Sequence, residues 1–272
     1  MFFNTVGFVT ETLGEGQPVR GVSTLQHRFY VLRGNVSEDQ IEVYDSESFR
    51  LLRYLDLPDL GFAFDIVVSG RHRCAYVSDT SNHSVHRVKL SGAETTHWPV
   101  QDVPACLSLT IRHMVLVTCR KVDIVKEFTT DGELLREVVL DEVVSPWHTV
   151  QLYSGEYVMC HGDSGEALHR VCLVDSGGQL VSAFGEADVM KTPTHMAVDR
   201  NEFVFVIDRN NNRVLLLSPS LTYVREVVSR DELGWKPYRL ALDYKRRRLY
   251  VAVNDKNRRG DYTAGRVIAV DV

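Results

Sequence analysis

The sequence lacks the marks of a secreted, membrane-spanning or disulfide-bonded protein. Its five cysteines are an odd number and include no CxxC pair, which predicts reduced thiols in an intracellular setting. No apolar stretch approaches the roughly 18 residues that a spanning helix needs. The first residues carry no basic segment typical of a signal peptide. We therefore expect a cytoplasmic chain with no membrane contact.

An excess of positive charge is missing, and so are the motifs of common enzymes. The net charge of −5 disfavours a protein that holds nucleic acid over its whole surface, although a local basic patch stays compatible with it. The sequence contains no GxSxG, HExxH or P-loop motif. These absences favour a binding protein with no cofactor and no DNA partner over an enzyme.

Helical periodicity is nearly absent, and only residues 228–235 suggest a short helical turn. A repeat of short β-forming strands is present instead, and its clearest marker recurs at steps of about 40–48 residues. The six copies of this marker are 29–32, 75–79, 115–119, 156–160, 204–208 and 249–253. Strands such as 203–207 are apolar almost throughout, which indicates burial on both faces, as in the radially packed sheets of a β-propeller.

The repeat predicts an all-β fold: a single domain, residues 1–272, that forms a six-bladed β-propeller of four-stranded antiparallel blades. The expected blades are approximately 16–58, 59–101, 102–141, 142–186, 190–230 and 235–272. The last repeat has only three strands, whereas residues 4–13 form a spare strand before the first repeat. We therefore expect the N-terminal strand to complete the last blade and close the ring, and the isolated domain to be monomeric.

Two repeats carry a more specific pattern. The fifth reads PTHMAVD over 193–199 and FVIDRNNNRV over 205–214, and the second reads YVSDTSNHSV over 76–85. This pattern resembles the NHL-repeat propellers, in particular the C-terminal propeller of TRIM-NHL proteins. The resemblance extends over essentially the whole chain, although four repeats retain only the hydrophobic skeleton and Ser84 replaces the usual arginine.

The motif residues themselves are expected to serve the scaffold. Asp79 and Asp208 can accept hydrogen bonds from backbone N–H groups of their loops, and Asn82 and Asn211 suit tight turns. Arg213 can pair with a nearby carboxylate or carbonyl group.

The innermost strand of each blade should line the central channel, and its third residue is polar or reactive in every repeat. These six residues are Arg20, Asp65, Cys106, His148, His195 and Arg239. We expect them to form a ring near one channel mouth. Cys106, His148 and His195 are of the types that bind zinc, so a metal site is one interpretation. A solvated polar channel with Arg–Asp pairing is the interpretation that we favour.

The favoured function is a non-catalytic interaction scaffold that binds a protein partner through one rim, as the recognition domain of a larger TRIM-NHL-like protein would. Candidate anchors are the aromatic residues Trp98, Trp147, Trp235 and Tyr238. Trp147 and Tyr238 flank the channel ring, so packing between blades is the alternative for these two.

Two alternatives stay open beside the protein-binding scaffold. RNA binding is the first, because NHL domains of TRIM-type proteins read RNA on a basic rim. The basic residues here are Arg209, Arg213, Lys256, Arg258 and Arg259. A channel-metal lyase or hydrolase is the second, because the NHL-like peptidyl-hydroxyglycine amidating lyases hold a channel zinc with histidines.

Overall fold

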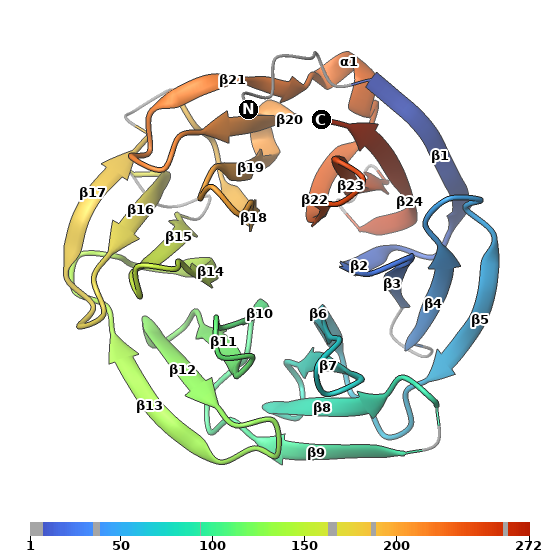
Figure 1. Cartoon of the computed structure of the whole chain (residues 1–272), viewed down its shortest axis with the longest axis horizontal. Helices are drawn as coiled ribbons and strands as arrows, with labels where there is room; N and C mark the ends of the chain where they lie inside the picture. Colours follow the sequence, from blue (N-terminus) through green and yellow to red (C-terminus); the bar gives the residue numbers. More distant parts are fainter. Residues whose placement is uncertain (1–7, 35–38, 93, 163–167, 186–188, 258–260) are drawn as a thin grey trace.

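The computed structural model of the chain describes residues 8–34, 39–92, 94–162, 168–185, 189–257 and 261–272. In these ranges the strands β1 to β24 form six four-stranded sheets, which stand like blades around a common axis (Figure 1). Every pairing within a blade is antiparallel. The chain is a six-bladed β-propeller, as the sequence predicts.

Each of the first three blades runs outward from its innermost strand in chain order (Figure 1). The first blade contains β2 (Val19–Leu25), β3 (Arg28–Gly34), β4 (Asp39–Asp45) and β5 (Leu51–Asp56). The second contains β6 (Ala63–Ser69), β7 (Cys74–Asp79), β8 (Ser84–Lys89) and β9 (Thr95–Pro99). The third contains β10 (Leu107–Leu109), β11 (Val115–Cys119), β12 (Ile124–Phe128) and β13 (Leu134–Val139).

The other three blades repeat this order, and the N-terminal strand joins the last of them. The fourth blade contains β14 (Pro146–Gln151), β15 (Tyr157–His161), β16 (Arg170–Val174) and β17 (Leu180–Phe184). The fifth contains β18 (Pro193–Val198), β19 (Val204–Asp208), β20 (Arg213–Leu217) and β21 (Tyr223–Val228). The sixth contains β22 (Lys236–Asp243), β23 (Arg248–Lys256), β24 (Tyr262–Asp271) and, outermost, β1 (Phe8–Gly16).

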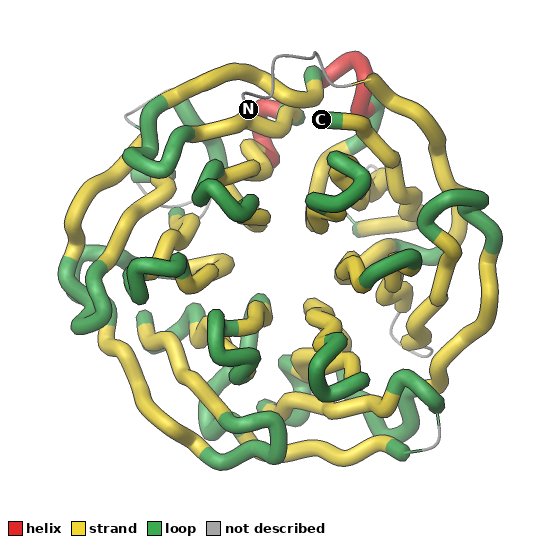
Figure 2. Tube along the Cα trace, in the orientation of Figure 1, coloured by secondary structure: helices red, strands yellow, loops and turns green. Residues whose placement is uncertain are grey.

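Helix is confined to two short segments of the described chain, as Figure 2 shows. They are the 3-10 turn η1 (Arg209–Asn211) and the helix α1 (Arg230–Leu233), which lies within the segment for which the sequence suggests a helical turn. No helix among the described residues is long and apolar enough to cross a membrane.

The apolar core lies between neighbouring blades. Every residue of β7 and β19 is buried, whereas the outermost strands β5 and β13 leave most of their residues exposed or partly exposed. One cluster joins Phe205 and Ile207 of the fifth blade to Leu240 and Val251 of the sixth. The inner strands are therefore apolar on both faces because a blade packs on each side of them.

The motif residues of the fifth blade fix a rim loop to the segment that enters the same blade. The Asp208 carboxylate accepts hydrogen bonds from the Lys191 backbone N–H at 2.7 Å and from the side chains of Asn211 and Arg213 at 2.8 Å each. The left-handed residue of the turn is the next one, Asn212, with φ at 54°. The expected scaffold role of these residues is confirmed.

The second blade repeats this arrangement. Asp79 accepts hydrogen bonds from the backbone N–H groups of Gly61 at 2.7 Å and Asn82 at 3.1 Å. The left-handed residue is again the next one, His83, with φ at 50°. A buried carboxylate thus holds the corresponding loop in both blades that carry the NHL-like pattern.

The ring is closed by the N-terminal strand, as the sequence predicts. β1 pairs with β24 from Phe8 opposite Asp271 to Gly16 opposite Gly265, so the strand extends past the expected end at residue 13. Residues 4–7 of the expected strand lie outside the described residues. The buried Asn254 side chain also joins the sixth blade to the first, because it bonds both the N–H and the C=O of Val19 at 2.9 Å.

Deletion of residues 1–12 is expected to destabilise all six blades together. The truncated chain would lose most of the β1–β24 pairing and expose the outer edge of the last blade. We expect one cooperative transition, with a loss of about 3 kcal/mol and a melting temperature lower by roughly 6–12 °C. Thermal melting followed by circular dichroism measures this, with Thr12→Ser as the control. A truncated chain that melts like the full chain would contradict it.

Candidate functional site

The innermost strands bring five of the six predicted ring residues together: Asp65, Cys106, His148, His195 and Arg239. The pairing of four of these strands with their neighbours shifts register at the start, for example between Ala63 and Asp65 in β6. Such bulges redirect a side chain out of the regular alternation. In this protein the bulges lie next to Asp65, His148, His195 and Arg239, whose side chains meet near the propeller axis.

Asp65 is the centre of this group, and its contacts reach three other blades. Its Oδ1 lies 3.3 Å from Nε of Arg239, and its Oδ2 lies 3.5 Å from Nε2 of His195. The Leu107 backbone N–H donates to Oδ2 at 2.9 Å. Burial opposes ionisation of Asp65, but His195 and Arg239 outweigh it and hold the pKa of this carboxyl below its ordinary value.

Both ring nitrogens of His148 are occupied by backbone groups. Nδ1 accepts a hydrogen bond from the Met196 N–H at 3.2 Å, so Nε2 carries the proton and donates it to the Leu107 carbonyl at 3.3 Å. The ring stacks on His195, with centroids 3.9 Å apart and planes 8° from parallel. Burial and then the His195 ring lower the pKa of His148 well below its ordinary value, which keeps His148 neutral.

A metal ion does not suit this group, although the ligand atoms of Asp65, His148 and His195 all lie within 4.8 Å of one another. His148 has no lone pair left, because both of its ring nitrogens are engaged. The Asp65 charge is balanced by the fully buried Arg239 guanidinium, which would repel a divalent cation. We therefore interpret this group, the channel network of Asp65, His148, His195 and Arg239, as structural.

Cys106 is also a poor zinc ligand or nucleophile. Burial raises the pKa of its thiol well above the ordinary value, and the nearby Asp65 carboxylate raises it further, although Arg239 opposes both effects. The thiolate is the form that binds metal or attacks a substrate, and it is disfavoured here.

Arg20, the sixth predicted ring residue, lies apart from the channel network. Its guanidinium stands 4.2 Å from the centroid of the Phe62 ring. Of the six residues predicted to form one ring, five therefore form a connected group in the structure. The sixth, Arg20, forms a separate cation–π pair with Phe62.

The predicted basic rim is only partly assembled in the described residues. Arg209 and Lys256 meet over a shared ring, since both stand above Tyr262, at 5.9 and 4.5 Å from its centroid. Arg213 instead pairs with the buried Asp208 at 2.8 Å. Arg258 and Arg259 lie outside the described residues.

The expectation of an exposed aromatic anchor is wrong for Trp98, and of the two alternatives for Trp147 and Tyr238 the structure has the buried one. Trp98, Trp147 and Tyr238 expose only 6%, 8% and 6% of their surfaces. Trp98 and Trp147 belong to core clusters between blades, whereas the Tyr238 ring lies against Phe64 and Tyr262. Trp235 is half-buried, and the Arg266 guanidinium lies 4.4 Å from the centroid of its ring.

Sequence reasoning missed two residues beside Arg209 and Lys256. Lys236 begins the innermost strand of the sixth blade, and its Nζ donates to the Asn210 side chain at 3.2 Å. Tyr262 begins β24, and its hydroxyl accepts a hydrogen bond from Arg209. Lys236 lies two residues before Tyr238, and side chains two residues apart in a strand lie on the same face. This spacing is the sequence signal that could have identified Lys236.

No model of a protein family matches this sequence, and no curated protein matches it either. Solved structures do resemble it. Virginiamycin B lyase from Staphylococcus aureus gives a TM-score of 0.65 at 9% identity, over 96% of this chain and 99% of that one. The PQQ-bound aldose sugar dehydrogenase from Streptomyces coelicolor gives 0.71 at 11% identity, over 97% of each chain. A structure titled as a nidogen/laminin complex gives 0.67 at 14% identity, over 82% of this chain and 84% of that one.

Identities this low show the fold alone. These structures include enzymes and a protein–protein complex, so likeness to them does not decide between catalysis and binding. Membership of the NHL-repeat family stays an expectation, because no family model matches.

The channel network predicts that the protein loses stability as pH falls from about 7.5 to 5.5. The pKa values of His148 and His195 are lowered by burial in the folded chain, whereas unfolded histidine titrates near about 6.5. Below that pH the unfolded state takes up protons that the folded state does not. The free energy of unfolding should then fall by up to about 1.4 kcal/mol per pH unit for each histidine.

Urea unfolding at several pH values measures this dependence. His148→Gln should make the free energy of unfolding less dependent on pH, because the unfolded state then takes up one proton fewer. His83→Asn, on an exposed turn, should leave the pH dependence unchanged. A wild-type stability that stays constant over this range would contradict the interpretation.

Proposed function

We propose that this protein is a non-catalytic interaction domain that binds an acidic segment of a protein partner at one channel mouth. The observation that carries the proposal is a group of cations set over tyrosine rings with no paired carboxylate. We call this group the cationic mouth: Arg209 and Lys256 lie against the rings of Tyr238 and Tyr262, and Lys236 is near enough for both charges to act on it.

The contacts of the cationic mouth hold its charges side by side. The Arg209 guanidinium stands 5.7 Å from the Tyr238 centroid and donates to the Tyr262 hydroxyl. The Lys256 ammonium stands 4.5 Å from the Tyr262 centroid. The two rings themselves lie 5.5 Å apart. Aromatic and arginine side chains together are the groups that contribute most to protein interfaces.

The three cations of the mouth repel one another. Burial lowers the pKa of Lys236, and Arg209 and Lys256 lower it further. Within the described part of the chain, none of the three forms an ion pair with a carboxylate. A bound anion would relieve this repulsion, so an anionic ligand is the chemistry that the mouth favours.

A protein segment suits the mouth better than a nucleic acid does. Exposed carboxylates lie in the same segments as the cations: Asp255 and Asp261 are in the hairpin of Lys256, and Asp231 is in the helix that precedes Lys236. A phosphate backbone that ran across this rim would meet these charges, and the chain carries a net charge of −5. A short acidic peptide segment, in contrast, can bind the cationic mouth alone without crossing these carboxylates. RNA is the second candidate, because the same cations would also pair with phosphate groups.

The non-catalytic part of the proposal rests on the channel network. Asp65 and His148 of this network have their polar atoms engaged by the protein itself, which leaves them poorly suited to act on a substrate. The resemblance to a structure of a nidogen/laminin complex is compatible with a protein-binding propeller.

The test is the affinity of the full chain for a short oligo-glutamate peptide and for an oligouridine of equal length, measured by fluorescence anisotropy. We expect saturable binding of the peptide, weakened about tenfold or more by Arg209→Glu and by Lys256→Glu. The matched control is Lys121→Glu, an exposed lysine of the same rim on the third blade, which should bind as the wild type does.

Two outcomes would contradict the proposal. If oligouridine binds more tightly, with affinity that falls steeply between about 50 and 200 mM salt, RNA is the ligand. If neither probe binds, or if all variants bind equally, the cationic mouth is not the interaction site.

A further inference from the structure

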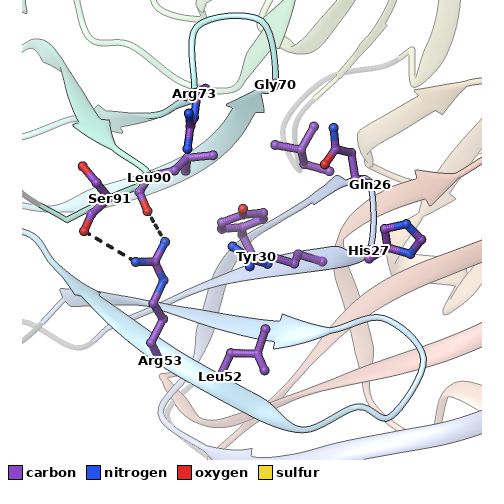
Figure 3. A pocket seen from close by; sticks show the side chains of 11 residues that line it. Gln26, His27, Tyr30, Leu52, Arg53, Gly70, Arg73, Leu90 and Ser91 are labelled. Carbon is purple, nitrogen blue, oxygen red and sulfur yellow. Dashed lines mark hydrogen bonds between the residues drawn. The ribbon is translucent and has the colours of Figure 1, made fainter.

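The rim opposite the cationic mouth holds a cavity between the first and second blades (Figure 3). Its volume is about 820 Å³, which falls in the range of sites that enclose a small ligand. The turn between β2 and β3 forms one wall, and the turn between β6 and β7 forms another. The outermost strand β5 of the first blade and the end of β8 complete it.

The charged side chains that line the cavity are all basic. Arg28, Arg53 and Arg73 all line the cavity, together with His27, and no lining residue is acidic. Within the described chain, none of these arginines forms an ion pair. Because the three arginines line the cavity from three separate segments, they offer an anion in it several cationic partners.

Two of the arginines, Arg28 and Arg53, act on the buried hydroxyl group of Tyr30. Figure 3 shows the Tyr30 ring among the lining residues, with Arg73 above it and Arg53 below it in this view. Burial raises the pKa of Tyr30, and Arg28 and Arg53 oppose that rise, so both guanidinium groups act on the same hydroxyl. Arg53 is held at the wall because it donates to the backbone carbonyls of Leu90 and Ser91. The site is therefore partly ordered before a ligand arrives.

Apolar side chains form another part of the lining, beside the polar Gln26, His27 and Ser91. Leu25, Leu52 and Leu90 line the cavity beside the arginines, and Leu52 leaves 47% of its surface exposed. Gly70 also belongs to the lining, and a side chain at that position would collide with Leu25, because an added Cβ would lie 2.6 Å from its Cδ1. Cationic and apolar groups thus face the same space.

We propose that this cavity binds a small amphiphilic anion, whose carboxylate or phosphate group lies among Arg28, Arg53 and Arg73 and whose apolar part packs on Leu25, Leu52 and Leu90. The two headgroups share the same recognition chemistry, since planar guanidinium groups pair with both. The apolar part gains the leucine surface that water otherwise covers. This site is distinct from the cationic mouth and does not depend on the function proposed for it.

The test is isothermal titration calorimetry of the full chain with octanoate and with phenyl phosphate. Acetate, inorganic phosphate and octylamine serve as comparison ligands. We expect saturable binding of at least one amphiphilic anion, at least about tenfold tighter than its headgroup alone or than octylamine. The tighter of the two amphiphiles identifies the headgroup as carboxylate or phosphate.

The variants separate charge from apolar contact. Arg28→Gln and Arg73→Gln, both at exposed positions, should weaken the amphiphile about tenfold or more. Leu52→Gln should weaken the amphiphile several-fold and leave binding of the small headgroup unchanged. Arg71→Gln is the matched control, because Arg71 is an exposed arginine on the same turn as Arg73 but does not line the cavity.

Three results would overturn the proposal. They are no saturable binding of either amphiphile, equal affinity for acetate or phosphate and the matching amphiphile, and unchanged affinity in Arg28→Gln and Arg73→Gln. Thermal melting of each variant confirms that a lost affinity does not reflect unfolding.

Discussion

One buried carboxylate holds the blades of this propeller to one another. Asp65 of the second blade accepts a hydrogen bond from the third blade, pairs with His195 of the fifth and neutralises Arg239 of the sixth. His148 of the fourth blade bridges the backbones of the third and fifth. Gly21 gives the first blade its close approach, because an added Cβ would lie 2.7 Å from Ile66 and 3.2 Å from Asp65. A buried charge is tolerated only with its partners in place, so this network favours the closed ring over any open arrangement.

This central role separates the parts of the molecule that hold the fold from the parts that are free to bind. Asp65, His148 and Arg239 of the channel network use their polar groups internally, and the loops of the motif-bearing blades are fixed by Asp79 and Asp208. Unpaired charge lies at the rims instead, in the cationic mouth on one side and in the arginine-lined cavity on the other. The two rims thus offer different anion sites, one open and flanked by carboxylates, and one recessed and partly apolar.

The architecture and the membership of the channel group could be predicted from the sequence, because both follow from a repeat. Each innermost strand begins at the same phase of its repeat, so alignment of the repeats brings Asp65, His148, His195 and Arg239 to one level. Their roles could not be predicted, because the partners that occupy His148 are backbone groups of Leu107 and Met196. Trp98 and Trp147 look like rim residues in sequence, yet blade packing buries them. The cavity could not be predicted from the sequence either, because Arg28, Arg53 and Arg73, which line it, belong to three segments of two blades.

The central claim is that Asp65 and Arg239 are a structural pair on which ring closure depends. The most direct test is a double-mutant cycle of Asp65→Asn and Arg239→Gln, measured as the free energy of unfolding in urea. Each single variant should lose about 3–5 kcal/mol, because it leaves a buried group unpaired. The double variant should lose less than the sum of both, with a coupling energy of about 2 kcal/mol or more. Single variants as stable as the wild type, or losses that simply add, would contradict the account.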